Sequence, residues 1–180
     1  MRTQKVLKEA TLVFPIREDE RVLLGFKPSN RTPEHKIGEG YWNGYGGGVL
    51  SGVSVRRQAV LEVSQESGLF VHESDLKKVA IAVFHNKMPD GVGYFECKVH
   101  VFLAVKWEGE PNSSEEMTYP VWFPISHISR MRDFMMPADC FWVPAALAGK
   151  KIHVYGFYGP YQRTLLRRVV VEEVQELEEE

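Results

Sequence analysis

The chain has 180 residues, of which 44% are hydrophobic and 12% are aromatic. This length and apolar content suffice for one well-packed domain and are short for two, so we expect residues 1–180 to form a single domain. The formal net charge is -2, from 22 basic and 24 acidic residues. The chain therefore lacks the strong basic field that would attract nucleic-acid polymers or anionic membranes.

The N-terminal segment MRTQKVLKEA is charged and lacks the apolar stretch of a secretion signal. No apolar run approaches the roughly 20 residues that a membrane helix needs. The two cysteines, Cys97 and Cys140, have no metal-binding spacing and predict reduced thiols in apolar surroundings. We therefore expect a cytoplasmic monomer that binds neither a membrane nor a nucleic-acid polymer.

The first forty residues predict a β-hairpin followed by a loop. Residues 10–16 and 21–26 are β-rich runs separated by a charged turn, and residues 28–40 hold two prolines and two glycines. Lys27 closes the second strand beside this loop and is a candidate for contact with a phosphate. A solvated lysine at a strand end is the alternative.

Residues 42–69 read WNGYGGGVLSGVSVRRQAVLEVSQESGL and predict a glycine loop (residues 44–48) that leads into a helix. Ser54 is the expected N-cap and Gly68 the expected C-cap. Apolar residues recur every four positions on one helical stripe: Val55, Ala59 and Val63.

Glu62 and Glu66 lie four residues apart and therefore point together from another face of this helix. By themselves they indicate a solvated face that tolerates mild repulsion. Next to a glycine loop they also provide the oxygen ligands that a divalent cation and phosphate groups require.

The second half of the chain predicts two further hairpins, two helices and an acidic tail. The runs 76–85 and 93–107 form one hairpin, residues 108–118 a polar loop, and residues 119–123 a strand. A short helix near residues 125–128 precedes the aromatic segment 134–148, whose second half is expected to be helical. The runs 151–157 and 163–174 pair through Gly159 and Pro160, and the tail 172–180 is expected to fray. This order predicts an α+β fold or a three-layer α/β/α sandwich with a mixed sheet.

The segment from Gly47 to Leu69 resembles the Nudix box, whose pattern is G-x5-E-x7-R-E-U-x-E-E-x-G-U with U aliphatic. Six positions match it: Gly47, Glu62, Val63, Glu66, Gly68 and Leu69. Three depart from it, since Val53 replaces Glu, Leu61 replaces Arg and Gln65 replaces the middle Glu.

The preceding WNGYGG is similar to the MutT-like branch of the Nudix hydrolases, the oxidised-purine nucleoside triphosphatases. The similarity covers nearly the whole chain, with segments VLLGFK, SSEEMTYPVWF, PADCFWVP and KKIHVYGFYG. This resemblance implies the α/β/α sandwich and a purine nucleoside triphosphate as substrate, hydrolysed to the monophosphate and pyrophosphate.

By this resemblance, the metal site would hold Mg²⁺, with Mn²⁺ as an alternative. Glu62, Glu66 and Glu116 would supply carboxylates, and Gly46 a backbone carbonyl; Glu115 is the solvated neighbour. Glu62 is the candidate for catalytic base or metal ligand, and Glu66 for metal ligand.

The resemblance also implies polar base readers at Asn43 and Asp139, and an apolar wall at Phe84. Met136 stands where the branch has Trp, and Ala138 where it has a second Asp, so we expect weaker discrimination between oxidised and ordinary guanine. From the residues alone, a local backbone cap at Asn43 and a helix N-cap at Asp139 are the alternatives. Three aromatic residues are expected in the core: Phe134, Phe141 and Trp142.

The departures at positions 53, 61 and 65 leave two functions open. Gln65 removes one negative charge from the cation site and cannot accept a proton as a carboxylate would. Val53 and Leu61 could replace a Glu and Arg pair without leaving a buried charge unmatched. The protein is then either a Nudix-type pyrophosphohydrolase or a catalytically impaired nucleotide-binding or interaction module on the same scaffold.

Overall fold

The computed structural model describes residues 6–29 and 36–179, which form an eight-stranded mixed sheet flanked by helices. The strands are β1 (Val6–Arg17), β2 (Arg21–Phe26), β3 (Trp42–Asn43), β4 (Leu76–Lys87), β5 (Tyr94–Ala104), β6 (Thr118–Pro124), β7 (Ile152–Tyr158) and β8 (Val170–Glu173). The helices are α1 (Val55–Ser67) and α2 (Asp139–Leu147), with short 3-10 helices η1 (Glu73–Asp75), η2 (Ile125–Arg130) and η3 (Pro160–Gln162).

The strand order is β3-β2-β1-β5-β4-β7-β8, and β6 pairs with β2 outside this path. The predicted hairpins are confirmed, because β1 pairs antiparallel with β2 and β4 pairs antiparallel with β5. The pairs β1–β5 and β4–β7 are parallel, which makes the sheet mixed as expected.

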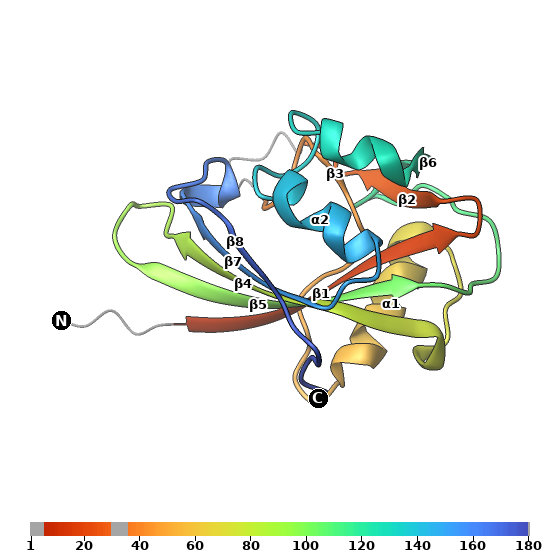
Figure 1. Cartoon of the computed structure of the whole chain (residues 1–180). Coiled ribbons are helices and arrows are strands. Elements are labelled where there is room, and N and C mark those ends of the chain that lie inside the picture. Colours follow the sequence, from red (N-terminus) through yellow and green to blue (C-terminus); the bar gives the residue numbers. More distant parts are fainter. Residues whose placement is uncertain (1–5, 30–35, 180) are drawn as a thin grey trace.

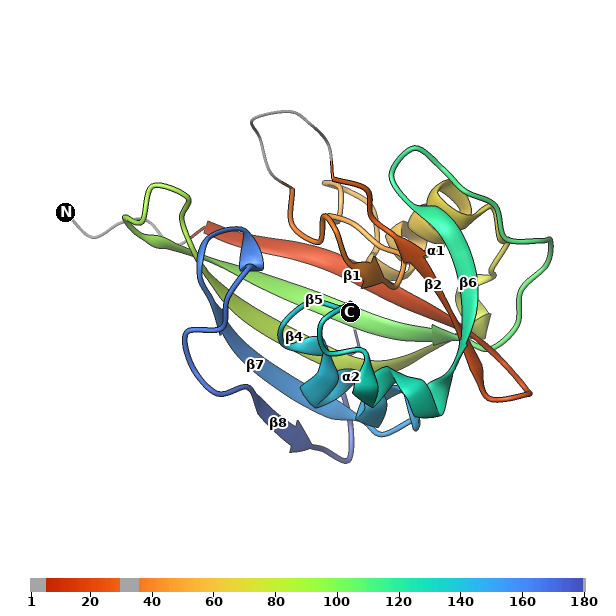
Figure 2. The same cartoon turned by 90° about the horizontal axis from the view of Figure 1, so that it is seen from above.

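Helices α1 and α2 lie on opposite faces of the sheet (Figures 1 and 2). Successive strand residues point to opposite faces, so Val13 of β1 joins the cluster that contains α1, and Phe14 joins the cluster that contains α2. In β5, Phe102 and Leu103 divide in the same way. The predicted α/β/α sandwich is therefore confirmed.

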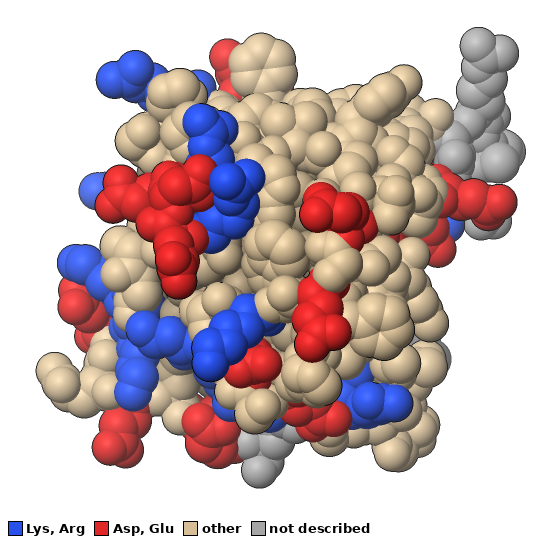
Figure 3. All heavy atoms as spheres, turned by 90° about the vertical axis from the view of Figure 1, so that its right-hand side faces the viewer, with Lys and Arg blue, Asp and Glu red and all other residues tan. Residues whose placement is uncertain are grey.

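The charged side chains do not form a large basic field on the face seen in Figure 3, where acidic groups lie beside the basic ones on the left and among uncharged residues on the right. Asp19 shows this local pairing, since its carboxylate oxygens lie 3.0 Å from Arg17 Nε and 3.4 Å from Arg21 Nε. Among the described helices, none is long and apolar enough to cross a membrane.

Two aromatic residues expected in the core are exposed instead. Phe134 and Phe141 keep 60% and 49% of their surface exposed, whereas Trp142 is buried. Helix α2 packs only one face on the sheet, and Trp142 and Ala146, one turn apart, occupy that face. Phe141 points away from that face and Phe134 lies before the helix begins, so both stay exposed and the prediction for these two phenylalanines is wrong.

The acidic tail, predicted to fray from residue 172, is docked over the part that the structure describes. Strand β8 pairs antiparallel with β7, although only residues 170–173 of the expected strand 163–174 form it. Leu177 is buried, and Lys78 Nζ donates a 2.7 Å hydrogen bond to the Glu178 carbonyl. Lys98 Nζ lies 3.2 Å from the Glu178 carboxylate. The buried Leu177 and the two lysines thus offset the repulsion among the tail carboxylates that the acidic composition predicts.

The docked tail predicts a measurable loss of stability when its apolar anchor is truncated. We expect Leu177→Ala to lower the free energy of unfolding by about 2 kcal/mol, because it removes buried methyl groups. Urea unfolding measures this change. Glu176→Ala, at an exposed neighbouring position, is the matched control, and equal unfolding midpoints for both variants would contradict the docking.

Candidate active site

The glycine loop lies along the edge of β1 that β2 leaves free. Thr11 N–H donates to the Gly47 carbonyl at 2.8 Å, and Val13 exchanges hydrogen bonds with Tyr45 at 2.7 and 2.9 Å. A Cβ at Gly46 would lie only 2.0 Å from the Thr11 carbonyl oxygen, so a side chain cannot be accommodated there. The loop therefore pairs with β1 through two isolated antiparallel bridges, Ala10 with Gly48 and Val13 with Tyr45.

Helix α1 has the caps that the sequence predicted. Ser54 Oγ accepts from Arg57 N–H at 3.2 Å, and Gly68 has the left-handed φ of 76° of a C-cap residue. The stripe of Val55, Ala59 and Val63 is buried beneath the sheet, which turns Glu62 and Glu66 toward the glycine loop.

Glu66 is held against the loop by a single backbone group. Gly46 N–H donates to Glu66 Oε2 at 2.9 Å, and the side chain is buried. Burial raises the pKa of the Glu66 carboxyl to about 7, and repulsion from Glu62 and Glu116 adds to this increase. The Gly46 N–H and the nearby Lys27 ammonium oppose it. A cation in this position would favour the charged carboxylate.

Glu66 borders a cavity of about 190 Å³, which we call the acidic hollow. It is lined by Glu62, Gln65, Glu66, Ser114, Glu115 and Glu116. The structure thus brings the distant loop of Glu116 to α1, and it places Glu115 there as well. Gln65, which replaces a glutamate of the pattern, faces the same hollow.

This donor set fits a hard divalent cation only in part. Among the described residues, no three acidic, histidine or cysteine side chains are close enough to form a complete metal site. Mg²⁺ usually binds through one or two protein carboxylates and completes its shell with water and substrate phosphates. The carboxylates of the acidic hollow fit that mode of binding, and not a metal enclosed by protein alone.

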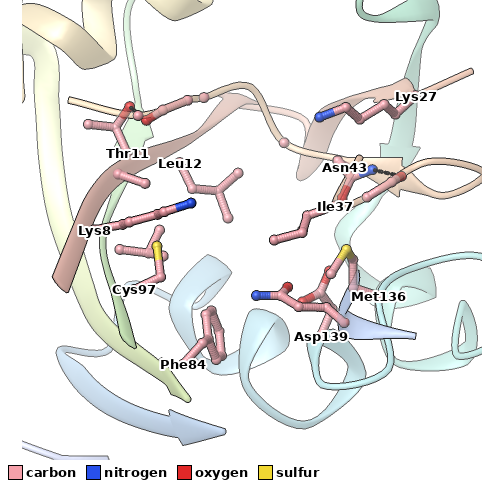
Figure 4. A pocket seen from close by; sticks show the side chains of 18 of the residues that line it. Lys8, Thr11, Leu12, Lys27, Ile37, Asn43, Phe84, Cys97, Met136 and Asp139 are labelled. Carbon is pink, nitrogen blue, oxygen red and sulfur yellow. Dashed lines mark hydrogen bonds between the residues drawn. The ribbon is translucent and has the colours of Figure 1, made fainter. Parts of the chain in front are cut away.

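A second, larger cavity of about 340 Å³, the apolar hollow, opens on the other side of Glu66. All five residues predicted to contact substrate line it: Lys27, Asn43, Phe84, Met136 and Asp139. Figure 4 shows Lys27 and Asn43 on one side, Phe84, Met136 and Asp139 below, and Lys8 and Cys97 opposite. Glu66 lines both hollows, so a ligand could reach from one into the other.

Asn43 has the local role that the sequence left open as an alternative. Its Nδ2 donates to the Tyr41 carbonyl at 2.8 Å. It also donates to the Gly38 carbonyl at 3.2 Å (Figure 4). These bonds fix the amide and turn its donors to the backbone. The side chain still lines the apolar hollow, where an amide oxygen is an acceptor.

Asp139 is not the N-cap of α2, because Ala138 occupies that position without a side-chain cap. Its carboxyl group is buried at the first turn and lines the apolar hollow. Burial raises the pKa of Asp139 to about 7, opposed by the N–H groups of the Trp142 side chain and the Met136 backbone. The protonated and charged forms are therefore both accessible near neutral pH.

Several residues of the apolar hollow were not predicted from the sequence. Gln162 is buried there and donates from Nε2 to Asn86 Oδ1 at 2.7 Å, while Asn86 Nδ2 donates to the Phe84 carbonyl at 2.8 Å. Tyr161 and Gln162 both have positive φ, 56° and 57°. No local pattern in the sequence signals this conformation, since neither residue is glycine. Cys97, expected as a core thiol, also lines this hollow and is half-buried.

The chain is similar to two named proteins over most of its length. No protein-family model matches the chain. The oxidized purine nucleoside triphosphate hydrolase of Danio rerio is 36% identical over 156 residues, covering 86% of this chain and 87% of that protein. The protein of the same name from Mus musculus is 38% identical over 142 residues, covering 78% and 80%.

A solved structure shows the same fold. The MutT protein of Bacillus halodurans matches with a TM-score of 0.70 at 22% identity, covering 92% of this chain and 97% of that one. The MutT-like sandwich inferred from the sequence is thus found independently in three dimensions.

Three adjacent glycines provide a graded test of the loop geometry. We expect Gly46→Ala to destabilise the fold by about 3 kcal/mol or more, because its Cβ would meet the Thr11 backbone. Gly47→Ala should fold but weaken Mn²⁺ binding, because its Cβ would lie 2.7 Å from Glu62 Oε1 and displace that carboxylate. Urea unfolding and calorimetric titration measure the two effects.

Gly48→Ala is the matched control for both measurements. A Cβ at Gly48 meets nothing closer than 4.0 Å, so this variant should retain stability and Mn²⁺ affinity. Equal behaviour of all three variants would show that the loop does not press on β1 and Glu62 as described.

Proposed function

Because the chain belongs to the MutT-like Nudix hydrolases, we propose that it hydrolyses purine nucleoside triphosphates, oxidised forms included, to the monophosphate and pyrophosphate with Mg²⁺. The observation that carries this proposal is the position of Glu66 between the two hollows. A purine would occupy the apolar hollow, and its phosphates would extend past Lys27 and Glu66 toward the acidic hollow.

The base would lie among groups of mixed chemistry. Phe84 provides an aromatic wall and is fixed edge-on against Tyr158, with ring centroids 5.4 Å apart. Met136 supplies a polarizable thioether, and Asp139 and Gln162 provide buried polar groups. A site with buried polar groups discriminates by leaving them unpaired when the wrong base enters.

The phosphates would meet the positive and negative groups in turn. Lys27 offers an ammonium group near Glu66 that can neutralise a phosphate oxygen. Glu62, Glu66 and Glu116 would hold Mg²⁺, with Mn²⁺ as an alternative, and the Gly46 carbonyl is a further candidate ligand. When bound, the cation neutralises the charge that develops on the phosphate oxygens.

Glu62 is assigned to the proton transfer. A water attacks the α- or the β-phosphorus, Glu62 accepts the proton that the water loses, and the bond from the attacked phosphorus to the oxygen that bridges the two phosphates breaks. The bridging oxygen keeps the bonding electron pair and leaves with the phosphate group that is not attacked, which yields the monophosphate and pyrophosphate. Glu62 suits this role because it borders the acidic hollow and is only half-buried.

The decisive experiment measures pyrophosphate release from ordinary and oxidised purine triphosphates with Mg²⁺ or Mn²⁺. We expect turnover by the wild type and a decrease of at least about 100-fold in Glu62→Gln, because the amide cannot accept the proton. Glu115→Gln, at the neighbouring position in the hollow, should lose much less.

The departures from the Nudix pattern favour one competing function, a nucleotide-binding module without catalysis. Gln65 faces the acidic hollow and reduces its negative charge. Calorimetry with nucleotide and metal separates the two functions. Binding without pyrophosphate release would establish the module and overturn the enzyme, and equal release by the wild type and Glu62→Gln would remove Glu62 from the mechanism.

The pKa of Asp139 predicts a pH-dependent substrate preference. The carboxyl group can donate a hydrogen bond below about pH 7 and only accept one above it. The ratio of kcat/KM for two purine substrates should therefore change across pH 7. Titration of the metal site affects both substrates alike and cancels from this ratio. Asp139→Asn should lower purine turnover, flatten the pH profile of the ratio and leave Mn²⁺ affinity intact. An unchanged ratio profile in this variant would show that Asp139 does not read the base.

A further inference from the structure

Leu61 replaces the arginine of the Nudix pattern next to Glu62, yet the Glu62 carboxylate is held in one place. Gln58, one turn earlier on α1, donates from Nε2 to Glu62 Oε1 at 2.7 Å. Its own Oε1 accepts from Leu50 N–H at 3.3 Å. The side chain of Gln58 is 3% exposed, so this amide has little freedom to exchange these partners for water.

The two bonds fix which way the amide points. Leu50 N–H is a donor and can only face the Gln58 oxygen, which leaves the NH₂ group to face the Glu62 carboxylate. A flipped amide would place donor against donor and acceptor against acceptor. The chain entering α1 therefore dictates the position of the donor that Glu62 meets.

Gly47 closes the other side of the Glu62 carboxylate. A Cβ at this position would lie 2.7 Å from Oε1 and 3.0 Å from Oε2, so the carboxylate rests directly against the loop backbone. With Gln58 Nε2 on Oε1, the side chain is confined between the loop and the helix. Such confinement leaves Oε2 as the oxygen without a bond to Gln58.

Neighbouring cations on α1 do not provide this restraint. Arg56 Nη1 donates to the carbonyls of Glu73 and Leu76 at 3.2 and 2.9 Å, and Nη2 lies 3.4 Å from Glu179. Its guanidinium group is thus turned toward η1 and the C-terminal tail. Arg57 is exposed, and its backbone N–H serves the Ser54 cap.

We propose that Gln58 is a positioning residue, which orients Glu62 in this chain without an arginine at position 61. The proposal rests on the proposed function for its catalytic consequence, but the restraint itself acts on Glu62 whether or not substrate is present. Gln58 is not among the residues lining either hollow, so it acts through Glu62 and not on the nucleotide.

Gln58→Met tests the proposal, because it keeps the length and packing of the side chain and removes both hydrogen bonds. Leu50 is 63% exposed, so water can satisfy its freed N–H and the fold should remain stable. We expect kcat to fall by about 10- to 100-fold and Mn²⁺ affinity to fall severalfold, as when the support of a metal ligand is lost. KM and the thermal midpoint should change little.

Gln58→Glu separates orientation from packing. When ionised, the carboxylate retains the acceptor for Leu50 N–H but cannot donate to Glu62 and repels it, so at a pH where both groups are charged kcat should fall at least as far as in Gln58→Met. Arg57→Ala, next to it on the helix, is the control and should behave as the wild type. Wild-type kcat in both Gln58 variants would overturn the proposal, and so would a loss of kcat matched by an equal loss of thermal stability.

The measurements also separate this proposal from the proposed function. If the wild type binds Mn²⁺ but hydrolyses no nucleotide, the hydrolase proposal fails, and Gln58 is decided by Mn²⁺ affinity alone: weaker binding in Gln58→Met supports it, and equal binding overturns it. If the wild type hydrolyses nucleotide and the Gln58 variants equal it, only the positioning proposal fails. A wild type that binds no Mn²⁺ and hydrolyses nothing overturns both.

Discussion

The pairing of the glycine loop with the edge of β1 is the constraint on which the site depends. The loop backbone comes so close to Thr11 that position 46 has no room for a Cβ. That approach places Gly46 N–H on Glu66 and Gly47 against Glu62. Glu66 is therefore positioned by a main-chain N–H, and Glu62 is confined between the loop backbone and the Gln58 amide, so neither depends on the side chains that depart from the Nudix pattern.

This dependence explains how a box with three altered positions can keep its shape. The altered residues Val53, Leu61 and Gln65 supply none of the hydrogen bonds that link the loop to the helix within the described residues. Gly46, Gln58 and Leu50 supply them instead. What the alterations change is charge, since Gln65 leaves the acidic hollow with one carboxylate fewer than the pattern provides.

The two hollows have opposite chemical demands, and the fold separates them by the thickness of one side chain. The apolar hollow raises the pKa of Asp139 by burial, and the acidic hollow adds carboxylate repulsion to the burial of Glu66. Both pKa values lie near 7, so the charge of the whole site changes around neutral pH. A metal ion with phosphate ligands would oppose this change at Glu66 but not at Asp139.

Local pattern alone determined the two main hairpins, the capped helix with its buried stripe, and the pair Glu62 and Glu66, because these depend on residues close together in the chain. Family resemblance supplied Glu116, Phe84 and Asp139, which the structure places at the two hollows. Only the tertiary structure decided the docking of the tail, the exposure of Phe134 and Phe141, and the contacts of Gln58 and Gln162. These depend on which segments meet in space, and an amide carries no signal in the sequence that reveals its partner.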